Sequence, residues 1–467
     1  MNILKSKSVF LAVCVVAIAV PLGLSTLAVH ADLTFILWAS SYVSEGHLNV
    51  YDFVANGPHP ERVESLTYPP LTYLFFGAII KLGKLIGLFG YADWSGPKQL
   101  RGTEYLFVRA LGYVPFIVLF AHTLRRSAES FFLEPSDESE EEGRSVFVLG
   151  LTSPIVLYVS LIFGQFDIIP TALMFAGVCA IAKGRLELGV AMLISGTWFK
   201  NFPVVFLVLS APIIIRKFGW LRASLSMGGA GAATALLFRA FRSPGFTEGY
   251  LRFRHHQYDV IAWAGPFGLT VSLSVVAIIC LLLAVSVLSA FKHSLEFPEA
   301  CLLVYVLAMV SVLAPRGWMP QYIAWLGPPV ALVFLSGLRL QSGFSPILYA
   351  ALCSVYLFSV PVLFPGNVDS NIFYKLASRG FRPLGDFLHY SSNRVQLWTL
   401  IAVLLVFHAL VALVMLVSPR WASAVFVPER RVRTLAQLQI GIGLSFAAYL
   451  AFVIANVVNL KLYVAGG

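Results

Sequence analysis

Apolar runs of about 15 to 25 residues recur along the whole chain, and each has the length of an α-helix that crosses a bilayer. A single water-soluble core would not need such runs. Charged residues make up only 12% of the 467 residues, about half of the roughly 25% that soluble domains carry. The pattern predicts an all-α polytopic membrane protein and excludes an ordinary soluble enzyme or a disordered chain.

We expect residues 1–467 to form a single integral-membrane domain with about 13 transmembrane helices. Several apolar runs are short, which favours some broken or half-spanning helices that line a protein cavity. The run over 8–29 is predicted to be a retained first span, because His30-Ala31-Asp32 is a poor cleavage site for a signal peptide. The five cysteines all fall inside apolar runs and are expected to be small buried side chains.

The net charge of +10 has a simple explanation in a membrane protein. Basic residues anchor cytoplasmic loops, so Lys183-Gly184-Arg185 and Arg216-Lys217 are expected to face the cytoplasm. Some basic residues could also serve a phosphate-bearing lipid, and no nucleic-acid partner is expected. The absence of an Asn-x-Ser/Thr sequon favours a prokaryotic plasma membrane over the endoplasmic reticulum of a eukaryote.

An acidic loop is predicted over 126–145 on the cytoplasmic side. Within it, Glu134–Glu142 reads EPSDESEEE and carries six of the 23 acidic residues of the chain. A run of like charges is usually solvated, and we expect no site there.

The first outward loop, 30–67, opens with Asp32 at the end of the first predicted span. Residues 33–44 are too short to span and apolar enough to form a helix that lies on the membrane interface. A carboxylate at this boundary is costly unless it is paired or functional. Asp32 is therefore either the N-cap of the interfacial helix or a catalytic acid.

Three further polar breaks are expected on the same outward side: Gly164–Asp167 with Gln165 and Asp167, the tip that carries Lys200, and Arg316–Tyr322 with Arg316 and Gln321. Each has an ordinary structural explanation, namely turn capping, a lysine that snorkels to the interface, and an aromatic belt. Their convergence on one side of the membrane indicates an active site there.

Basic residues also occur in the outward loop 242–267, against the positive-inside trend; they include Arg252, Arg254 and His255. A guanidinium group matches the geometry of phosphate, so these residues suit a lipid phosphate on the outer leaflet. The neighbouring histidines could instead bind a metal ion, although no carboxylate stands at a fixed spacing from them.

Several short segments together carry a family likeness: Asp32, WASSYVSEGHLNVYD (38–52), YPPL (68–71), GQFD (164–167), KGR (183–185), FKNFP (199–203) and PQYIAW (320–325). In order and spacing they resemble the GT-C class of integral-membrane glycosyltransferases. The resemblance is closest to the polyprenol-phosphate-mannose-dependent branch, which includes the bacterial DUF2029 (GT87) enzymes and the GPI mannosyltransferase I type.

The resemblance implies a GT-C-type fold, an outward or lumenal active site, and an inverting transfer from a polyprenyl-phosphate sugar to a glycolipid or glycan acceptor. It implies that Asp32 is the general base. Lys200, Arg252, Arg254, His255 and Arg316 are candidates to bind the donor phosphate. Gln165 and Asp167 are candidates either to hold sugar hydroxyl groups or to brace the base, and Gln321 is a further candidate to bind the donor. The D-x-D signature of some members is absent, because Leu33 and Thr34 follow Asp32. We therefore expect no cofactor, with a divalent metal left open as an alternative.

Mannose is the expected sugar, and a lipid-linked arabinose or glucose is the first alternative. A lipid or sugar transporter or flippase is the second. Transporters often show internal repeats and ionisable residues at mid-bilayer, whereas here the ionisable residues gather at the outward ends of the spans.

Overall fold

The computed structural model describes residues 6–27, 31–57, 59–90, 101–132 and 139–252, together with scattered positions from 262 to 357 and from 440 to 447. The chain separates into two compact units. Unit 1 comprises Met1–Ala31, Tyr113–Ile168 and Met319–Gly467, and unit 2 comprises Asp32–Gly112 and Ile169–Trp318.

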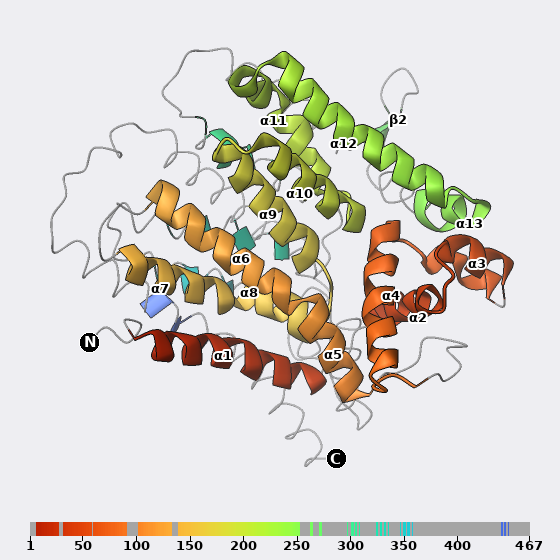
Figure 1. The fold of residues 1–467 in the computed structure, drawn as a ribbon, viewed down its shortest axis with the longest axis horizontal. Coiled ribbons are helices and arrows are strands. Elements are labelled where there is room, and N and C mark those ends of the chain that lie inside the picture. Colours follow the sequence, from red (N-terminus) through yellow and green to blue (C-terminus); the bar gives the residue numbers. More distant parts are fainter. Residues whose placement is uncertain are drawn as a thin grey trace. The chain divides into compact units, whose positions relative to one another are not determined.

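All the regular elements of unit 1 among its described residues are helices. Its elements are α1 (Lys7–Leu24), η2 (Ser25–Leu27), α6 (Val114–Ser127), the π-helix η4 (Ala128–Phe132), α7 (Ser139–Leu151), α8 (Pro154–Leu157) and the π-helix η5 (Tyr158–Ile162). Helices α6 and α7 pack side by side, and α1 lies against α7 (Figure 1). The α6–α7 approach is close, because a Cβ atom on Gly150 would lie 2.6 Å from the Cα atom of Ala121.

Unit 2 is also helical, apart from one short ribbon. Its helices are α2 (Ala31–Ser44), α3 (Val50–Asn56), η3 (Pro60–Ser65), α4 (Pro70–Leu85), α5 (Gly102–Gly112), α9 (Ile168–Ala182), α10 (Leu186–Phe199), α11 (Pro203–Phe218), α12 (Trp220–Phe241), α13 (Pro244–Phe246) and the π-helix η6 (Thr247–Arg252). Strands β1 (Ala262–Ala264) and β2 (Thr270–Ser272) pair antiparallel, with Trp263 opposite Val271. Helices α10, α11 and α12 pack against one another (Figure 1).

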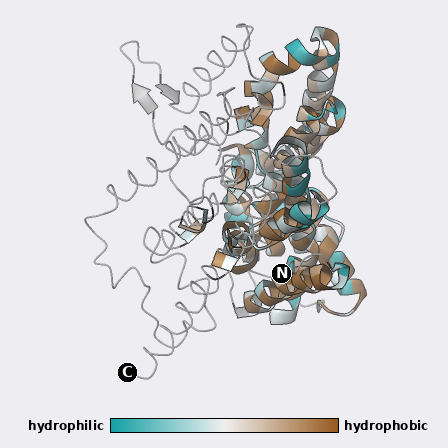
Figure 2. Cartoon of the chain, turned by 90° about the vertical axis from the view of Figure 1, so that its left-hand side faces the viewer, coloured by the Kyte–Doolittle hydropathy of each residue, from teal (hydrophilic) through white to brown (hydrophobic). Residues whose placement is uncertain are grey.

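Three helices among the described residues are long and apolar enough to cross a membrane: Lys7–Leu24, Gly102–Ser130 and Glu140–Ile162. The first of them coincides with the apolar run over 8–29 that the sequence analysis identified. The helices Ile168–Ala182 and Leu186–Phe199 are apolar but shorter. Apolar residues predominate in the described helices (Figure 2), which agrees with the predicted all-α membrane character.

Helix α2 occupies the segment predicted to lie on the membrane interface. It is buried on nearly all sides, since only Asp32 and Phe35 are partly exposed between Asp32 and Ser44. An interfacial helix usually keeps one polar face in solvent. Helix α2 is instead a packed helix of unit 2, because α3 and η3 fold back over it with aromatic contacts such as Tyr42 on Phe53.

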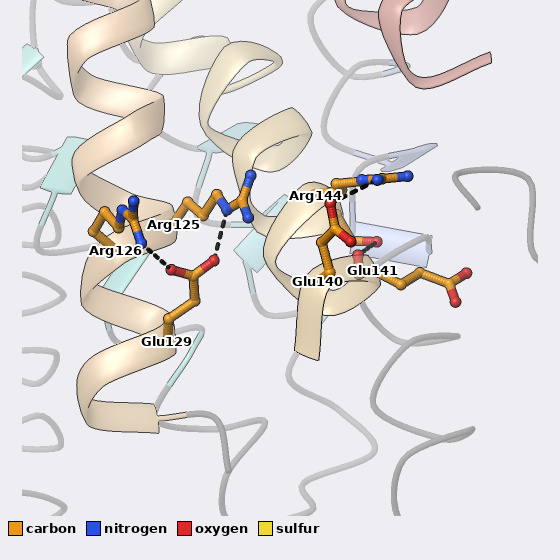
Figure 3. Close-up of polar contacts among 7 residues, drawn as sticks. Arg125, Arg126, Glu129, Glu140, Glu141 and Arg144 are labelled. Carbon is orange, nitrogen blue, oxygen red and sulfur yellow. Dashed lines mark hydrogen bonds and ion pairs between the residues drawn. The ribbon is translucent and has the colours of Figure 1, made fainter. Parts of the chain in front are cut away.

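The predicted acidic loop 126–145 is helical in the residues that the structure describes. Helix structure extends into 126–145 from both ends and leaves 133–138 outside the described residues. Arg125 and Arg126 contact Glu129 at 2.6 and 3.2 Å, and Arg144 contacts Glu140 at 2.7 Å (Figure 3). Glu141 and Glu142 are buried, in the first turn of α7, where the helix dipole favours acidic side chains.

Candidate functional site

A group of polar and aromatic residues in unit 2 joins three segments that the sequence analysis placed on the outward side. We call it the tyrosine cluster, and it consists of Tyr51, Tyr68, Lys200, Asn201 and Tyr250. The Tyr51 hydroxyl donates a hydrogen bond to the Tyr68 carbonyl oxygen. The Lys200 ammonium lies 5.7 Å from the centre of the Tyr68 ring. This places the predicted phosphate ligand Lys200 against the first outward loop.

Lys200 is almost completely enclosed, with only 5% of its surface exposed. A buried ammonium group is costly unless other groups stabilise it, and the Tyr68 ring face supplies one such contact. An enclosed lysine is also a pre-positioned point charge for an anionic ligand. The simple snorkelling explanation does not describe this geometry, because a snorkelling lysine keeps its charged head in water.

Two prolines and one hydrogen bond from a side chain to the backbone fix the position of the tip that carries Lys200. Pro70 and Pro203 are the first residues of α4 and α11, a position where the missing proline N–H costs nothing. The Thr72 hydroxyl donates a 3.1 Å hydrogen bond to the Phe199 carbonyl oxygen, which ties the first turn of α4 to the end of α10. The tip therefore has a defined place beside Tyr68.

The loop that carries Arg252 is attached to the same cluster. The Tyr250 hydroxyl donates a 2.7 Å hydrogen bond to Oδ1 of Asn201, and Tyr250 lies in η6, which ends at Arg252. Phe246 bridges the rings of Tyr51 and Tyr250 at centroid distances of 5.0 and 5.2 Å. The structure thus brings the Lys200 tip, the first outward loop and the start of loop 242–267 together.

Close backbone packing explains two glycines in this loop. A Cβ atom on Gly245 would collide with the Tyr51 carbonyl oxygen, and one on Gly249 would lie 2.5 Å from the Val63 carbonyl oxygen. Only glycine allows α13 and η6 to approach α3 and η3 this closely. Helix α13 lies beside α3 in Figure 1.

His59 and Arg62 of the predicted first outward loop contact Trp38 of α2, which is fully buried. The Arg62 guanidinium lies 5.5 Å from the centre of the Trp38 ring, and the His59 ring meets it edge-on at 6.0 Å. Nδ1 of His59 lies 3.3 Å from Oε1 of Glu61. Hydrogen bonding to its own backbone N–H, and then to His59, holds the pKa of the Glu61 carboxyl below its usual range.

Asp32 lies in the first turn of α2, and its side chain is partly exposed. Helix α2 begins at Ala31, so Asp32 is not the predicted N-cap and lies inside the first turn, where the helix dipole favours a carboxylate. The catalytic role of Asp32 stays a prediction. Two residues further on, the Thr34 hydroxyl lies 3.2 Å from the Tyr105 hydroxyl of α5. The guanidinium of Arg109, a fully buried residue, lies 5.4 Å from the centre of the Tyr105 ring.

The segment Gly164–Asp167 belongs to unit 1 and follows the π-helix η5. Gly164 has φ = 74°, a left-handed conformation that favours glycine. Its carbonyl oxygen accepts a 3.0 Å hydrogen bond from the Tyr113 hydroxyl, and the Gln165 N–H donates to the Val159 carbonyl oxygen at 3.0 Å. Gln165 and Asp167 are both completely buried.

Asp167 is also held from a distant part of the chain. The Trp325 indole N–H donates a 2.7 Å hydrogen bond to Oδ1 of Asp167, across 158 positions in the sequence. Both side chains are fully buried in unit 1. Two of the segments that carry the family likeness, GQFD and PQYIAW, therefore meet here.

The remaining candidates lie outside the described residues. Arg252 closes η6, but its side chain is not among those described, and neither are Arg254, His255, Arg316 and Gln321. Within the described part of the chain, no three His, Cys, Asp or Glu residues are grouped closely enough to hold a metal ion.

Comparison with known proteins gave no match among family models, curated proteins or solved structures. Sequence reasoning did not single out Trp325, Asn201 or Tyr250, although the first two lie within PQYIAW and FKNFP. For Tyr250 the sequence offers no signal, because its role depends on a contact with a residue 49 positions away.

Proposed function

We propose that the chain is a multi-pass, inverting membrane glycosyltransferase with a GT-C-type fold of about 13 transmembrane helices. It transfers a hexose, most simply mannose, from a polyprenyl-phosphate sugar to a glycolipid or glycan acceptor on the outer or lumenal face. The observation that carries the proposal is the tyrosine cluster, in which an enclosed lysine and the loop that leads to Arg252 meet the first outward loop. An enclosed lysine beside a predicted outward loop suits a lipid phosphate.

The proposed reaction is a single displacement at the anomeric carbon. The Asp32 carboxylate takes the proton of the acceptor hydroxyl group. At the same time, the oxygen of that hydroxyl group forms a bond to the anomeric carbon. The bond from that carbon to the phosphate oxygen breaks, and polyprenyl phosphate leaves with the electron pair. Lys200, with Arg252, Arg254, His255 and Arg316, stabilises the negative charge that grows on the phosphate.

The remaining proposed roles concern the sugar. Gln165, Asp167 and Gln321 are proposed to hydrogen-bond the hydroxyl groups of the donor hexose. A carboxylate accepts hydrogen bonds from hydroxyl groups, and an amide side chain both donates and accepts them. These side chains therefore suit this role.

The experiment that tests the proposal is incubation of the purified full-length protein with a panel of labelled polyprenyl-phosphate sugars, carrying mannose, arabinose or glucose, in membranes that contain candidate acceptors. Label in a product that is no longer attached to polyprenyl phosphate is the expected result. Movement of intact labelled lipid between leaflets, without transfer, would overturn the proposal in favour of a flippase.

A further inference from the structure

We infer that Trp325 is a positioning residue, which fixes the Asp167 carboxylate so that it can bind the hydroxyl groups of the donor hexose. The inference rests on the proposed function and adds a residue to its sugar-binding site. Its physical basis is the 2.7 Å hydrogen bond from the Trp325 indole N–H to Oδ1 of Asp167.

The chemistry of the two groups determines which of them donates the hydrogen bond. An indole N–H can only donate a hydrogen bond, and an ionised carboxylate can only accept one. Trp325 therefore favours the charged carboxylate over a protonated one, and it fixes one oxygen and the plane of the group. A rigid acceptor that loses no side-chain freedom on binding is what a sugar hydroxyl site requires.

The backbone around Asp167 is held as firmly as its side chain. The Tyr113 hydroxyl anchors the Gly164 carbonyl, and the Gln165 N–H closes the loop onto Val159 in η5. A π-helix places an extra residue in the turn and is found frequently at functional sites. Three hydrogen bonds thus hold the four residues Gly164–Asp167 in place. A simple connection between two helices needs fewer.

A merely structural role for Trp325 predicts a different outcome from a positioning role. If Trp325 only fills space, Trp325→Phe should lower the melting temperature and leave the kinetic constants of the folded fraction unchanged. If it positions Asp167, the variant should bind the donor sugar more weakly while the acceptor still binds normally, because the loss concerns one substrate alone.

The test measures kcat and KM for both substrates in four forms of the full-length protein: the wild type, Trp325→Phe, Asp167→Asn, and the double variant. We expect each single substitution to raise the KM for the polyprenyl-phosphate sugar at least tenfold, with the KM for the acceptor unchanged. We expect the double variant to be no worse than the more impaired single variant, since residues that act as a unit are not additive.

Trp198→Phe is the matched control, because the Trp198 indole N–H donates a 3.1 Å hydrogen bond to the Thr234 hydroxyl in unit 2. It should keep the wild-type donor KM. Equal rises in donor KM for both tryptophan variants, or additive effects of Trp325→Phe and Asp167→Asn, would overturn the inference. An active wild type with an unaffected Trp325→Phe variant refutes only this inference, whereas a wild type that transfers no sugar from any donor refutes the proposed function itself.

Discussion

The Tyr250 hydroxyl donates a 2.7 Å hydrogen bond to Oδ1 of Asn201, and this contact fastens the loop that leads to Arg252 onto the tip that carries Lys200. Tyr250 is almost fully buried, with 2% of its surface exposed. The pair joins two segments that are expected to bind the same lipid phosphate. Its loss should therefore affect both the stability of unit 2 and the binding of the donor.

Tyr250→Phe removes the hydroxyl and keeps the ring. We expect a loss of about 1 kcal/mol in the free energy of unfolding, because the Asn201 oxygen loses its donor. Thermal unfolding in detergent measures this change. Tyr305→Phe is the control, since the buried Tyr305 hydroxyl has no hydrogen-bond partner in the described part of the chain. Equal destabilisation by both substitutions would contradict the assignment.

Lys200→Met removes the charge and keeps most of the length of the side chain. A charge-assisted contact with phosphate contributes about 1.5–3 kcal/mol, so the KM for the donor should rise at least about tenfold. The KM for the acceptor should stay within twofold of the wild-type value. Lys81→Met is the matched control, because Lys81 is exposed on α4. Donor kinetics that do not differ between the two variants would remove Lys200 from the site.

Gly249→Ala tests the close approach of η6 to η3. The added Cβ atom would lie 2.5 Å from the Val63 carbonyl oxygen, and backbone atoms must shift to admit it. Overpacking of this kind costs about 1–3 kcal/mol, which thermal unfolding should detect. Gly229→Ala in α12 meets open space and should be neutral or stabilising by up to about 1 kcal/mol. The reverse order of stabilities would refute the described packing.

Glu61→Gln tests the electrostatics of the first outward loop. The pKa of Glu61 lies below its ordinary value of 4.5, so the ionised carboxylate stabilises the folded loop above that pH. The stabilisation is lost as the pH falls through the lowered pKa of the folded state. The wild type should therefore melt above Glu61→Gln at pH 6, and the difference should shrink as the pH is lowered below 4.5. A difference that is independent of pH would contradict this assignment.

The apolar runs predicted the helices well, because length and hydropathy are local properties of the sequence. The helix Lys7–Leu24 coincides with the first span predicted over 8–29, and Gly102–Ser130 and Glu140–Ile162 also have the length and hydropathy of membrane-crossing helices. Pro70 likewise begins α4, at a helix position that proline favours. These signals depend only on neighbouring residues and need no knowledge of the tertiary structure.

Burial and long-range contacts were harder to predict. The apolar stretch of α2 predicts a helix on the membrane interface, but nothing local reveals that α3 packs on Tyr42 and that Arg62 of η3 lies over Trp38. A run of acidic residues predicts a solvated loop, whereas Glu141 and Glu142 are buried. The sequence of such a run is the same whether its residues are exposed or buried in the fold. The sequence placed GQFD and PQYIAW on one side of the membrane but could not show that Asp167 meets Trp325.

The central claim is that Asp32 is the general base of a sugar transfer from a polyprenyl-phosphate donor. The most direct measurement compares the wild type with Asp32→Asn, which keeps the shape of the side chain and removes the base. We predict at least a hundredfold loss of kcat in the variant, as expected for a missing general base, with unchanged donor binding and melting temperature. Transfer by Asp32→Asn at the wild-type rate would contradict the account.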